Sequence, residues 1–203
     1  MSRKKEILGI DFDDVVFDCN ASIDAFHNER YGTAHTREDH TTYLFEDIWN
    51  VSSEEVRKRM GEWYNTGYHA GTPVVRGAKE ALLTLKGRYE IVIVTARSEE
   101  TRELTESWIQ KNLPGIADRT YFTGRGPLSP RGTAGGRKKS DVANELGIRY
   151  FVEDALHQVE DLVKNAPGTT VFLLDAPWNR IGAPENVTRA GSWDEIASAL
   201  LHR

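Results

Sequence analysis

The chain is poor in the residues that stabilise secreted proteins, and its start lacks a long apolar run. Cys19 is the one cysteine among 203 residues, so no disulfide can form within the chain. The apolar run at residues 7–10 is too short for a signal peptide or a membrane span, and carboxylates follow it directly. We therefore expect a reducing, cytoplasmic compartment and no association with membranes.

An excess of basic residues is also missing. The formal net charge is −5, which argues against a protein that wraps long nucleic acid. A small phosphorylated substrate remains compatible with this charge, because a local site can be electropositive on an acidic protein. Hydrophobic residues make up 39% of the chain and charged residues 28%, as in ordinary globular proteins. The composition leaves a homodimer open.

Short apolar runs alternate with amphipathic stretches along most of the chain, which predicts strands that alternate with helices. This order predicts an α/β fold, with a Rossmann-like parallel sheet between two layers of helices. The expected strands span residues 7–12, 89–95, 119–123, 149–152 and 169–174. The expected helices span residues 75–85, 99–113, 140–146, 155–165 and 193–201, and a glycine-rich loop covers residues 124–138.

Residues 17–73 interrupt this alternation directly after the first strand. They are rich in aromatic and charged residues, and their apolar positions recur at helical spacing. We therefore predict a catalytic core made of residues 1–16 and 74–203, and a small helical cap made of residues 17–73, called the insert below. The hinges between them are expected near Phe17 and Pro73.

Polar residues follow several of the predicted strands at the point where each strand ends. Asp11 and Asp13 follow the first strand and point to the same side of it; Thr95 follows the second, and Glu153 and Asp154 follow a later one. Ligands bind beyond the carboxyl ends of the strands in such sheets, so we expect these groups to meet there. Carboxylates that repel one another are stabilised by a hard divalent cation, and Mg²⁺ suits a few carboxylates together with a phosphate.

A lysine at a predicted helix start, Lys138 or Lys139, completes the set of side chains that phosphoryl transfer requires. That reaction needs positioning and neutralisation of charge around the phosphate, which a lysine and a threonine hydroxyl can supply beside the metal. A carboxylate can also serve as the nucleophile and form an aspartyl phosphate. The residues themselves therefore favour a phosphohydrolase.

In these motifs the chain resembles the phosphatases of the haloacid dehalogenase (HAD) superfamily. An apolar strand followed by Asp-x-Asp-x-Val stands at residues 7–15, and a second apolar strand ends in Thr95. The third motif is a lysine, for which we favour Lys139 over Lys138, and the fourth is the acidic pair at residues 153–154. All four motifs occur in order over about residues 5–175. The resemblance implies a HAD-like fold and Mg²⁺ as cofactor.

The resemblance also implies a role for each motif residue. Asp11 would be the nucleophile, and Asp13 would protonate the leaving oxygen and then activate a water molecule. The metal would be bound by Asp11, Asp154 and the main-chain carbonyl of Asp13, while Glu153, where the family more often has Gly or Asp, would hold a metal-bound water. The phosphoryl oxygens would be bound by Thr95, Ala96, Arg97 and Lys139, although Arg97 could equally cap the helix that follows it.

Within the superfamily, the chain is most similar to the 5′(3′)-deoxyribonucleotidases and their bacterial relatives. The insert lies between the first and second motifs, as the cap of those enzymes does, although Thr95-Ala96-Arg97 stands where they often have Thr-Ser-Pro. The resemblance implies a small phosphomonoester as substrate, and a nucleoside monophosphate as the best single choice. Trp63 and Tyr64 of the insert are candidates for contact with the base, but their spacing equally fits a cap core.

Other functions fit parts of the sequence. The enzyme could be a phosphatase for a non-nucleotide metabolite or a polynucleotide end, or the chain could be a non-catalytic HAD-fold binding protein. A phospho-receiver uses similar residues, but its phosphorylated aspartate follows a middle strand and no helical insert follows its first strand. A nucleotide-triphosphate loop is excluded at residues 136–140, because the Gly-Lys-Ser/Thr order is absent there.

Overall fold

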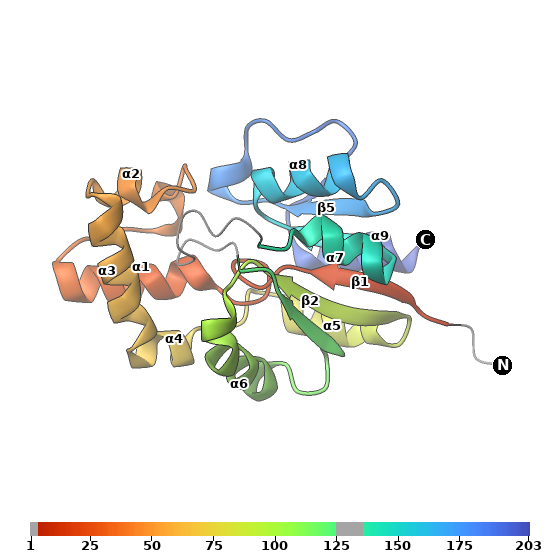
Figure 1. Cartoon of the computed structure of the whole chain (residues 1–203), viewed down its shortest axis with the longest axis horizontal. Coiled ribbons are helices and arrows are strands. Elements are labelled where there is room, and N and C mark those ends of the chain that lie inside the picture. The colour runs from red at the N-terminus through yellow and green to blue at the C-terminus, as the bar shows by residue number, and fades with distance from the viewer. Residues whose placement is uncertain (1–3, 125–135) are drawn as a thin grey trace.

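The computed structural model describes residues 4–124 and 136–203, so most of the predicted glycine-rich loop lies outside the described residues. A six-stranded parallel sheet forms the centre of the molecule, in the order β3-β2-β1-β4-β5-β6 (Figure 1). The predicted α/β fold of the Rossmann-like type is confirmed. The strands are β1 (Glu6–Ile10), β2 (Tyr89–Thr95), β3 (Arg119–Phe122), β4 (Ile148–Glu153), β5 (Thr170–Leu174) and β6 (Thr188–Ala190).

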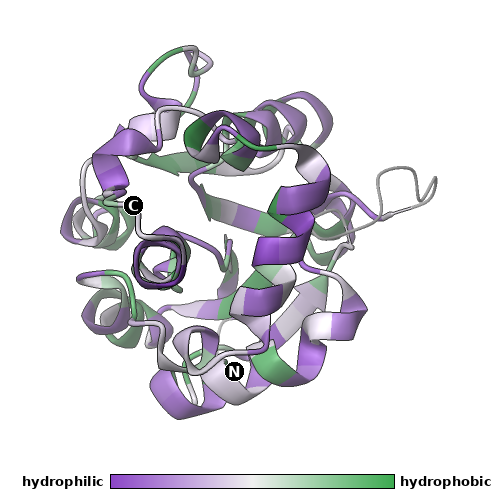
Figure 2. Ribbon diagram, turned by 90° about the vertical axis from the view of Figure 1, so that its left-hand side faces the viewer, coloured by the Kyte–Doolittle hydropathy of each residue, from purple (hydrophilic) through white to green (hydrophobic). Residues whose placement is uncertain are grey.

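Helices cover both faces of the sheet, because alternate residues of each strand point to opposite sides. In β1, Leu8 and Ile10 belong to one apolar cluster and Ile7 to the other. The first cluster includes residues of α5 (Ala78–Lys86), α6 (Arg102–Asn112) and α9 (Trp193–Leu201), and the second includes residues of α7 (Lys139–Leu146) and α8 (Leu156–Asn165). The helices carry hydrophilic and hydrophobic segments in alternation, as expected where one side of each is buried (Figure 2). No helix in the described ranges has both the length and the apolar character needed to cross a membrane.

Several elements differ from the sequence-based expectation. The first strand ends at Ile10 rather than at residue 12, and the helix expected from residue 99 begins as a 3-10 turn at Glu99–Thr101 before α6. The helix predicted to begin at residue 75 begins at Ala78, because Gly77 has a left-handed backbone (φ 79°) and the Ala78 N–H closes a turn on the Val75 carbonyl. Strand β6 was not predicted. It is only three residues long and is recognisable chiefly by its pairing with β5, which no local pattern reveals.

The insert forms a helical group beside the sheet, at the left of Figure 1. Buried aromatic and apolar side chains, among them Phe26, Met60 and Trp63, give it a core that is continuous with one face of the sheet. Ser52 caps one of its helices, α3, by accepting a hydrogen bond from the Glu55 N–H. The helices are α1 (Cys19–Tyr31), α2 (Phe45–Trp49), α3 (Ser53–Tyr64) and α4 (Gly67–Gly71), with a 3-10 turn at Arg37–Asp39.

The two chain segments that connect the insert to the sheet lie side by side. Phe17 and Val74 form an antiparallel bridge. The Asp18 N–H donates to the Pro73 carbonyl at 3.1 Å, and the Val75 N–H donates to the Val16 carbonyl at 2.9 Å. The chain thus leaves and re-enters the sheet domain at the two positions where the sequence predicts hinges, and movement about them stays a prediction.

Close packing of β1 against β4 generates the first testable prediction. A Cβ added at Gly9 would lie 2.7 Å from Phe151 Cδ2 and 3.0 Å from Ile148 Cδ1. Gly9→Ala should therefore lower the free energy of unfolding by about 1–3 kcal/mol, as overpacked cores do, in urea denaturation. Gly61→Ala is the control, because a Cβ there meets nothing within 4 Å and alanine should stabilise α3 by roughly 0.5–1 kcal/mol. Equal urea midpoints for Gly9→Ala and the wild type would contradict the prediction.

Candidate active site

Strand register brings three carboxylates together at the carboxyl edge of the sheet. Ile10 of β1 pairs with Val152 of β4, and the Asp11 N–H continues this ladder by donating to the Val152 carbonyl at 2.9 Å. Asp11 is therefore placed beside the residues that follow Val152. Carboxylate oxygens of Asp11, Glu153 and Asp154 lie within 4.8 Å of one another, and all three residues are buried. The structure thus assembles the acidic pocket that the strand ends led us to expect.

Lys139 is the basic residue that enters this acidic pocket. Its Nζ lies 2.5 Å from Asp11 Oδ1 and 2.7 Å from Glu153 Oε2, and its side chain is only 1% exposed. Lys139 is the first residue of α7, so the N-terminal end of this helix lies where the Lys139 ammonium can contact the residue that follows β1. Lys138, the alternative candidate, pairs instead with Asp161 at 2.9 Å on the surface. Of the two lysines, only Lys139 contacts the nucleophile candidate.

Burial makes this set of carboxylates costly without a further cation. Desolvation raises the pKa of Asp11 to about 7, and the charges of Glu153 and Asp13 add to the rise while Lys139 opposes it. Desolvation likewise raises the pKa of Glu153 to about 7, again against Lys139. The pKa of Asp154 is raised by burial and by the charge of Asp11. Three carboxylates therefore face one ammonium, and a divalent cation would balance the charge.

The surroundings of Asp154 fit a metal ligand. Its Oδ2 accepts hydrogen bonds from the Tyr43 hydroxyl and from Trp178 Nε1, both at 2.7 Å. Its Oδ1 is buried and has no hydrogen-bond partner within the described residues. Metal-ligating carboxylates are commonly held by such outer hydrogen bonds while one oxygen faces the ion. Oxygen ligands of this kind suit Mg²⁺.

The Glu153 carboxylate accepts hydrogen bonds from protein groups, whereas the resemblance implies a contact with a metal-bound water. Its Oε2 accepts from Lys139, and its Oε1 accepts from the main-chain N–H groups of Asp154 at 3.3 Å and Ala155 at 3.1 Å. Both oxygens therefore already have donors. In this arrangement Glu153 orients Lys139, and its predicted contact with a metal-bound water stays a prediction.

Arg97 contacts Asp13 rather than an open phosphate site. Its Nε donates to Asp13 Oδ2 at 3.0 Å, and its Nη2 donates to Asp13 Oδ1 at 2.7 Å. The alternative role as a helix cap is not observed either, since Ser98 occupies the N-cap position of the next turn. Arg97 is thus a partner of the second aspartate in the structure, and its predicted contact with phosphate stays a prediction.

Thr95 and Ala96 stand at the same edge of the sheet. The pairing of Ile10 with Ile93 places Thr95 level with Phe12, next to the acidic pocket. Thr95 is buried; its Oγ1 accepts from the Arg97 N–H at 3.1 Å, and its carbonyl accepts from the Thr123 N–H at 2.9 Å. Ala96 is half-buried in the turn that follows. This turn is therefore held firmly where the sequence predicts phosphate binding.

The two aromatic residues predicted to contact substrate have different positions. Trp63 is fully buried, and its Nε1 donates to Ser22 Oγ at 3.0 Å, so the structure favours its alternative role in the core of the insert. Tyr64 is half-buried and stacks on His69, with the ring centroids 5.0 Å apart. The Arg97 guanidinium carbon lies 5.6 Å from the centroid of the Tyr64 ring, so Tyr64 is next to the arginine that pairs with Asp13.

Two residues that contact Asp154 were missed by the sequence reasoning. Tyr43 comes from the insert and is 44% exposed, so its ring borders both the acidic pocket and solvent. Trp178 belongs to the 3-10 turn Pro177–Asn179, which follows β5. Its place shortly after a strand is the same signal that identified the aspartates, and that signal could have found it. Tyr43 has no comparable local signal.

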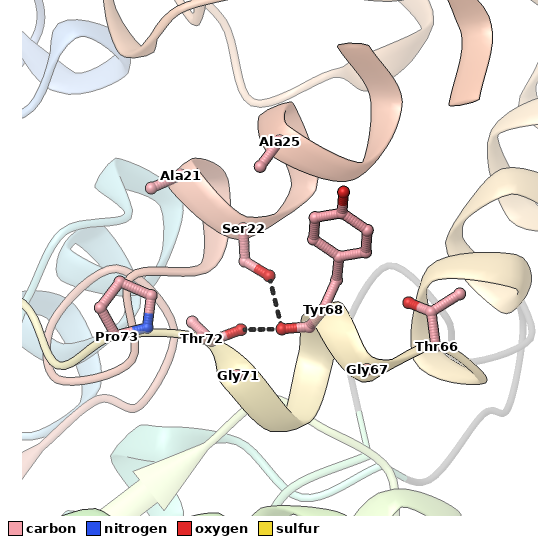
Figure 3. A pocket seen from close by; sticks show the side chains of 9 residues that line it. All are labelled: Ala21, Ser22, Ala25, Thr66, Gly67, Tyr68, Gly71, Thr72 and Pro73. Atoms are coloured by element: carbon pink, nitrogen blue, oxygen red, sulfur yellow. Dashed lines mark hydrogen bonds between the residues drawn. The ribbon is translucent and has the colours of Figure 1, made fainter. Parts of the chain in front are cut away.

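A surface groove of about 580 Å³ lies between α1 and α4, away from the acidic pocket (Figure 3). Hydrogen bonds join its walls: Ser22 Oγ and Thr72 Oγ1 both donate to the Tyr68 carbonyl at 3.0 Å. The first of these bonds attaches α4 to α1, and the second closes the C-terminal end of α4. The groove is lined by Ala21, Ser22, Ala25, Thr66, Gly67, Tyr68, Gly71, Thr72 and Pro73, none of which belongs to the acidic pocket.

Comparison with known proteins agrees with the geometry of this site. Residues 5–125 match the family model described as 5′ nucleotidase, deoxy (pyrimidine), cytosolic type C protein. The chain is 28% identical over 194 residues to a Halalkalibacterium halodurans protein provisionally named a nucleotidase, and the match covers 95% of this chain and 91% of that relative.

Solved structures show the same fold. A HAD family hydrolase of Deinococcus radiodurans, with bound phosphate and sodium, has a TM-score of 0.66 at 17% identity, covering 98% of this chain and 96% of that chain. The HAD hydrolase YfnB of Bacillus subtilis, bound to magnesium, has a TM-score of 0.62 at 14% identity, covering 98% and 99%. At these identities the likeness establishes the fold alone.

The match to the family model spans more than half of the chain. It includes Asp11, Asp13 and Thr95 and the whole insert between them, while the HAD fold extends over nearly all of the remaining chain. The predicted resemblance is therefore confirmed. The chain belongs to the cytosolic type C 5′-nucleotidase family of HAD-fold proteins and is a phosphoric monoester hydrolase.

Proposed function

We propose that the protein is a Mg²⁺-dependent phosphatase that hydrolyses (deoxy)nucleoside monophosphates through an aspartyl phosphate on Asp11. The observation that carries this proposal is the buried group of Asp11, Glu153 and Asp154 around the single ammonium of Lys139. Such a site provides a carboxylate nucleophile and positive charge next to it. The family supports a nucleotide substrate, and the magnesium bound by a protein of the same fold supports the metal.

Asp11 acts as the nucleophile in its ionised form. Lys139 favours this form, because its ammonium opposes the rise in the pKa of Asp11 that burial causes. Asp11, Asp154 and the main-chain carbonyl of Asp13 would hold Mg²⁺, which would supply positive charge to stabilise the phosphoryl oxygens. Lys139 and the turn at residues 95–96 hold those oxygens from the protein side.

Asp13 moves the proton in both halves of the reaction. In the first half an Asp11 oxygen bonds to phosphorus, the bond from phosphorus to the leaving ester oxygen breaks, and Asp13 gives its proton to that oxygen. In the second half Asp13 takes a proton from water as the water attacks phosphorus, and the bond to Asp11 breaks to release inorganic phosphate. The Asp13 side chain is 33% exposed, so it is accessible to water.

The insert acts as the cap over this site, with residues 1–16 and 74–203 as the catalytic core. The contact that supports this role is the hydrogen bond from Tyr43 of the insert to Asp154 of the core. The Tyr43 ring lies next to the acidic pocket, in edge contact with His157 at 5.4 Å and with Trp178 at 6.1 Å between centroids. A partly exposed ring in this position provides a surface on which a base can stack.

The nucleophile is tested by turnover of 4-nitrophenyl phosphate with Mg²⁺. Asp11→Asn should lower kcat by at least about a thousandfold, because removal of a catalytic nucleophile has large effects on rate. Asp47→Asn, at an exposed carboxylate of α2, is the control and should keep the wild-type rate. Equal activity of Asp11→Asn and the wild type would refute the mechanism.

Metal binding is tested by calorimetric titration of Mg²⁺ without substrate. Asp154→Asn should weaken Mg²⁺ binding at least about tenfold, a loss already typical when a residue that only supports a ligand is removed. Asp175→Asn is the matched control, because Asp175 also follows a strand at this edge but pairs with Arg189 at 2.6 Å. Unchanged affinity in Asp154→Asn would exclude Asp154 as a ligand.

The nucleotide preference is tested by kcat/KM for deoxynucleoside monophosphates against a sugar phosphate. Tyr43→Ala should lower this ratio by about tenfold, since stacking of a base on an aromatic ring contributes roughly 1–3 kcal/mol. Tyr43→Phe keeps the ring and should keep the ratio, although it loses the hydrogen bond to Asp154. Trp63→Ala should lower stability without changing the ratio. A wild-type preference for the sugar phosphate would contradict the nucleotide assignment.

A further inference from the structure

We propose that Arg97 is a positioning residue that makes the orientation of the Asp13 carboxylate depend on the insert, through His69 of α4. This role deepens the proposed function and rests on the assignment of proton transfer to Asp13. Nothing in the four motifs requires a basic residue two positions after Thr95. The contacts of Arg97 nevertheless connect the second aspartate, the core and the insert.

The guanidinium holds Asp13 by two parallel hydrogen bonds, from Nε to Oδ2 at 3.0 Å and from Nη2 to Oδ1 at 2.7 Å. A bidentate pair of this kind restricts rotation of the carboxylate as well as its position. Asp13 is partly exposed, and a partly exposed aspartate without such a pair has several rotamers available. The plane of the Arg97 guanidinium therefore sets the plane of the Asp13 carboxylate.

Arg97 is itself held on every side within the protein. The residue is only 4% exposed, and its guanidinium carbon lies 4.5 Å from the Phe12 ring centroid and 4.6 Å from that of Phe17. Aromatic faces bind a guanidinium by stacking and by cation–π attraction, and they leave its edge free to donate hydrogen bonds. Contact with aromatic rings thus restricts the guanidinium to movement within its own plane.

The remaining donor atom, Nη1, restricts this in-plane movement through two hydrogen bonds, one to the core and one to the insert. It donates to Thr105 Oγ1 of α6 in the core and to His69 Nε2 of α4 in the insert, both at 2.9 Å. Burial and the charge of Arg97 lower the pKa of His69 to about 4, so the ring is neutral at physiological pH and its Nε2 can accept. The insert therefore provides one of the two acceptors that hold Nη1.

His69 is fixed to the rest of the insert. Its ring packs against Trp63 and Tyr64, with centroids 5.0 Å apart in both cases. Its helix is attached to α1 by the hydrogen bond from Ser22 Oγ to the Tyr68 carbonyl, while Thr72 closes the end of α4 on the same carbonyl (Figure 3). A displacement of the insert would move His69 away from Nη1 and remove one of the two acceptors that hold this atom. The geometry thus links the orientation of Asp13 to the position of the insert.

The experiment compares two histidines of the insert that are matched in burial and in their contact with an arginine. His69 and His27 are both 1% exposed, and the Nε2 of each lies 2.9 Å from the Nη1 of an arginine. The arginine that contacts His27 is Arg59, which lies within the insert and pairs with Glu55 rather than Asp13. His69→Leu and His27→Leu each remove an acceptor from an arginine, and His27→Leu also removes the hydrogen bond to Thr33, but only His69→Leu affects the support of Asp13.

The readout is kcat/KM for benzyl phosphate, whose poor leaving group needs a proton, and for 4-nitrophenyl phosphate, whose good leaving group does not. His69→Leu should lower the value for benzyl phosphate at least about tenfold more than the value for 4-nitrophenyl phosphate, since general acid catalysis contributes about 10²–10⁴-fold. His69→Gln, with an amide oxygen that can accept from Nη1, should restore most of the difference. His27→Leu should leave the ratio of the two substrates at its wild-type value.

Two results would overturn the role of Arg97. In the first, both substrates lose the same factor in His69→Leu, which is what a general loss of folded enzyme produces. In the second, His27→Leu changes the ratio as much as His69→Leu does. His69→Ala, which has no acceptor for Nη1, gives the same readout if His69→Leu does not fold. The proposed function is tested separately, by turnover that is present in the wild type and lost in Asp11→Asn. If His69→Leu is active and its ratio of the two substrates is unchanged, only the positioning role of Arg97 is refuted.

Discussion

The whole site depends on the electrostatic cost of burying three carboxylates around one ammonium. Asp11, Glu153 and Asp154 are brought together by the pairing of β1 with β4, and Lys139 balances only part of their charge. Burial above all, and the neighbouring carboxylates in addition, raise the pKa values of Asp11 and Glu153 against the effect of Lys139. A cation and a phosphate can relieve the remaining imbalance of charge together, because the cation neutralises the carboxylates and the phosphate occupies the other side of the cation. The pairing of β1 with β4 thus creates an excess of buried negative charge, which a cation and a bound phosphate would compensate together.

Residues that follow buried strands were predictable from the sequence, because parallel strands end at a common edge. Asp11, Thr95 and Asp154 each follow an apolar run, and the structure places all three at that edge. Lys139 was preferred over Lys138 on the form of the helix that it begins, and the structure places only Lys139 in the pocket. These inferences succeeded because each depends on one short segment and on the rule that aligns segments in a sheet.

Contacts between side chains that lie far apart in sequence could not be predicted. Tyr43 of the insert reaches Asp154, and within the core Arg97 pairs with Asp13, but neither partner is marked by periodicity or spacing. Glu153 shows the same limit, since its oxygens are engaged by Lys139 and by main-chain N–H groups that only the folded turn presents. Side-chain partners that lie far apart in sequence need the tertiary arrangement, which local patterns do not encode.

The insert contacts the site at two separate points, and these points serve different carboxylates. Tyr43 donates to Oδ2 of Asp154, while His69 acts on Asp13 through Arg97. Both contacts use a neutral side chain, so neither contact adds charge to a site whose balance depends on a bound cation. The two contacts orient side chains instead. The Tyr43 contact engages Oδ2 of Asp154 and leaves Oδ1 without a partner among the described residues, and the His69 contact supports the plane of the Asp13 carboxylate through Arg97. An insert that merely covered the substrate would need neither contact, so their presence indicates that it completes the site.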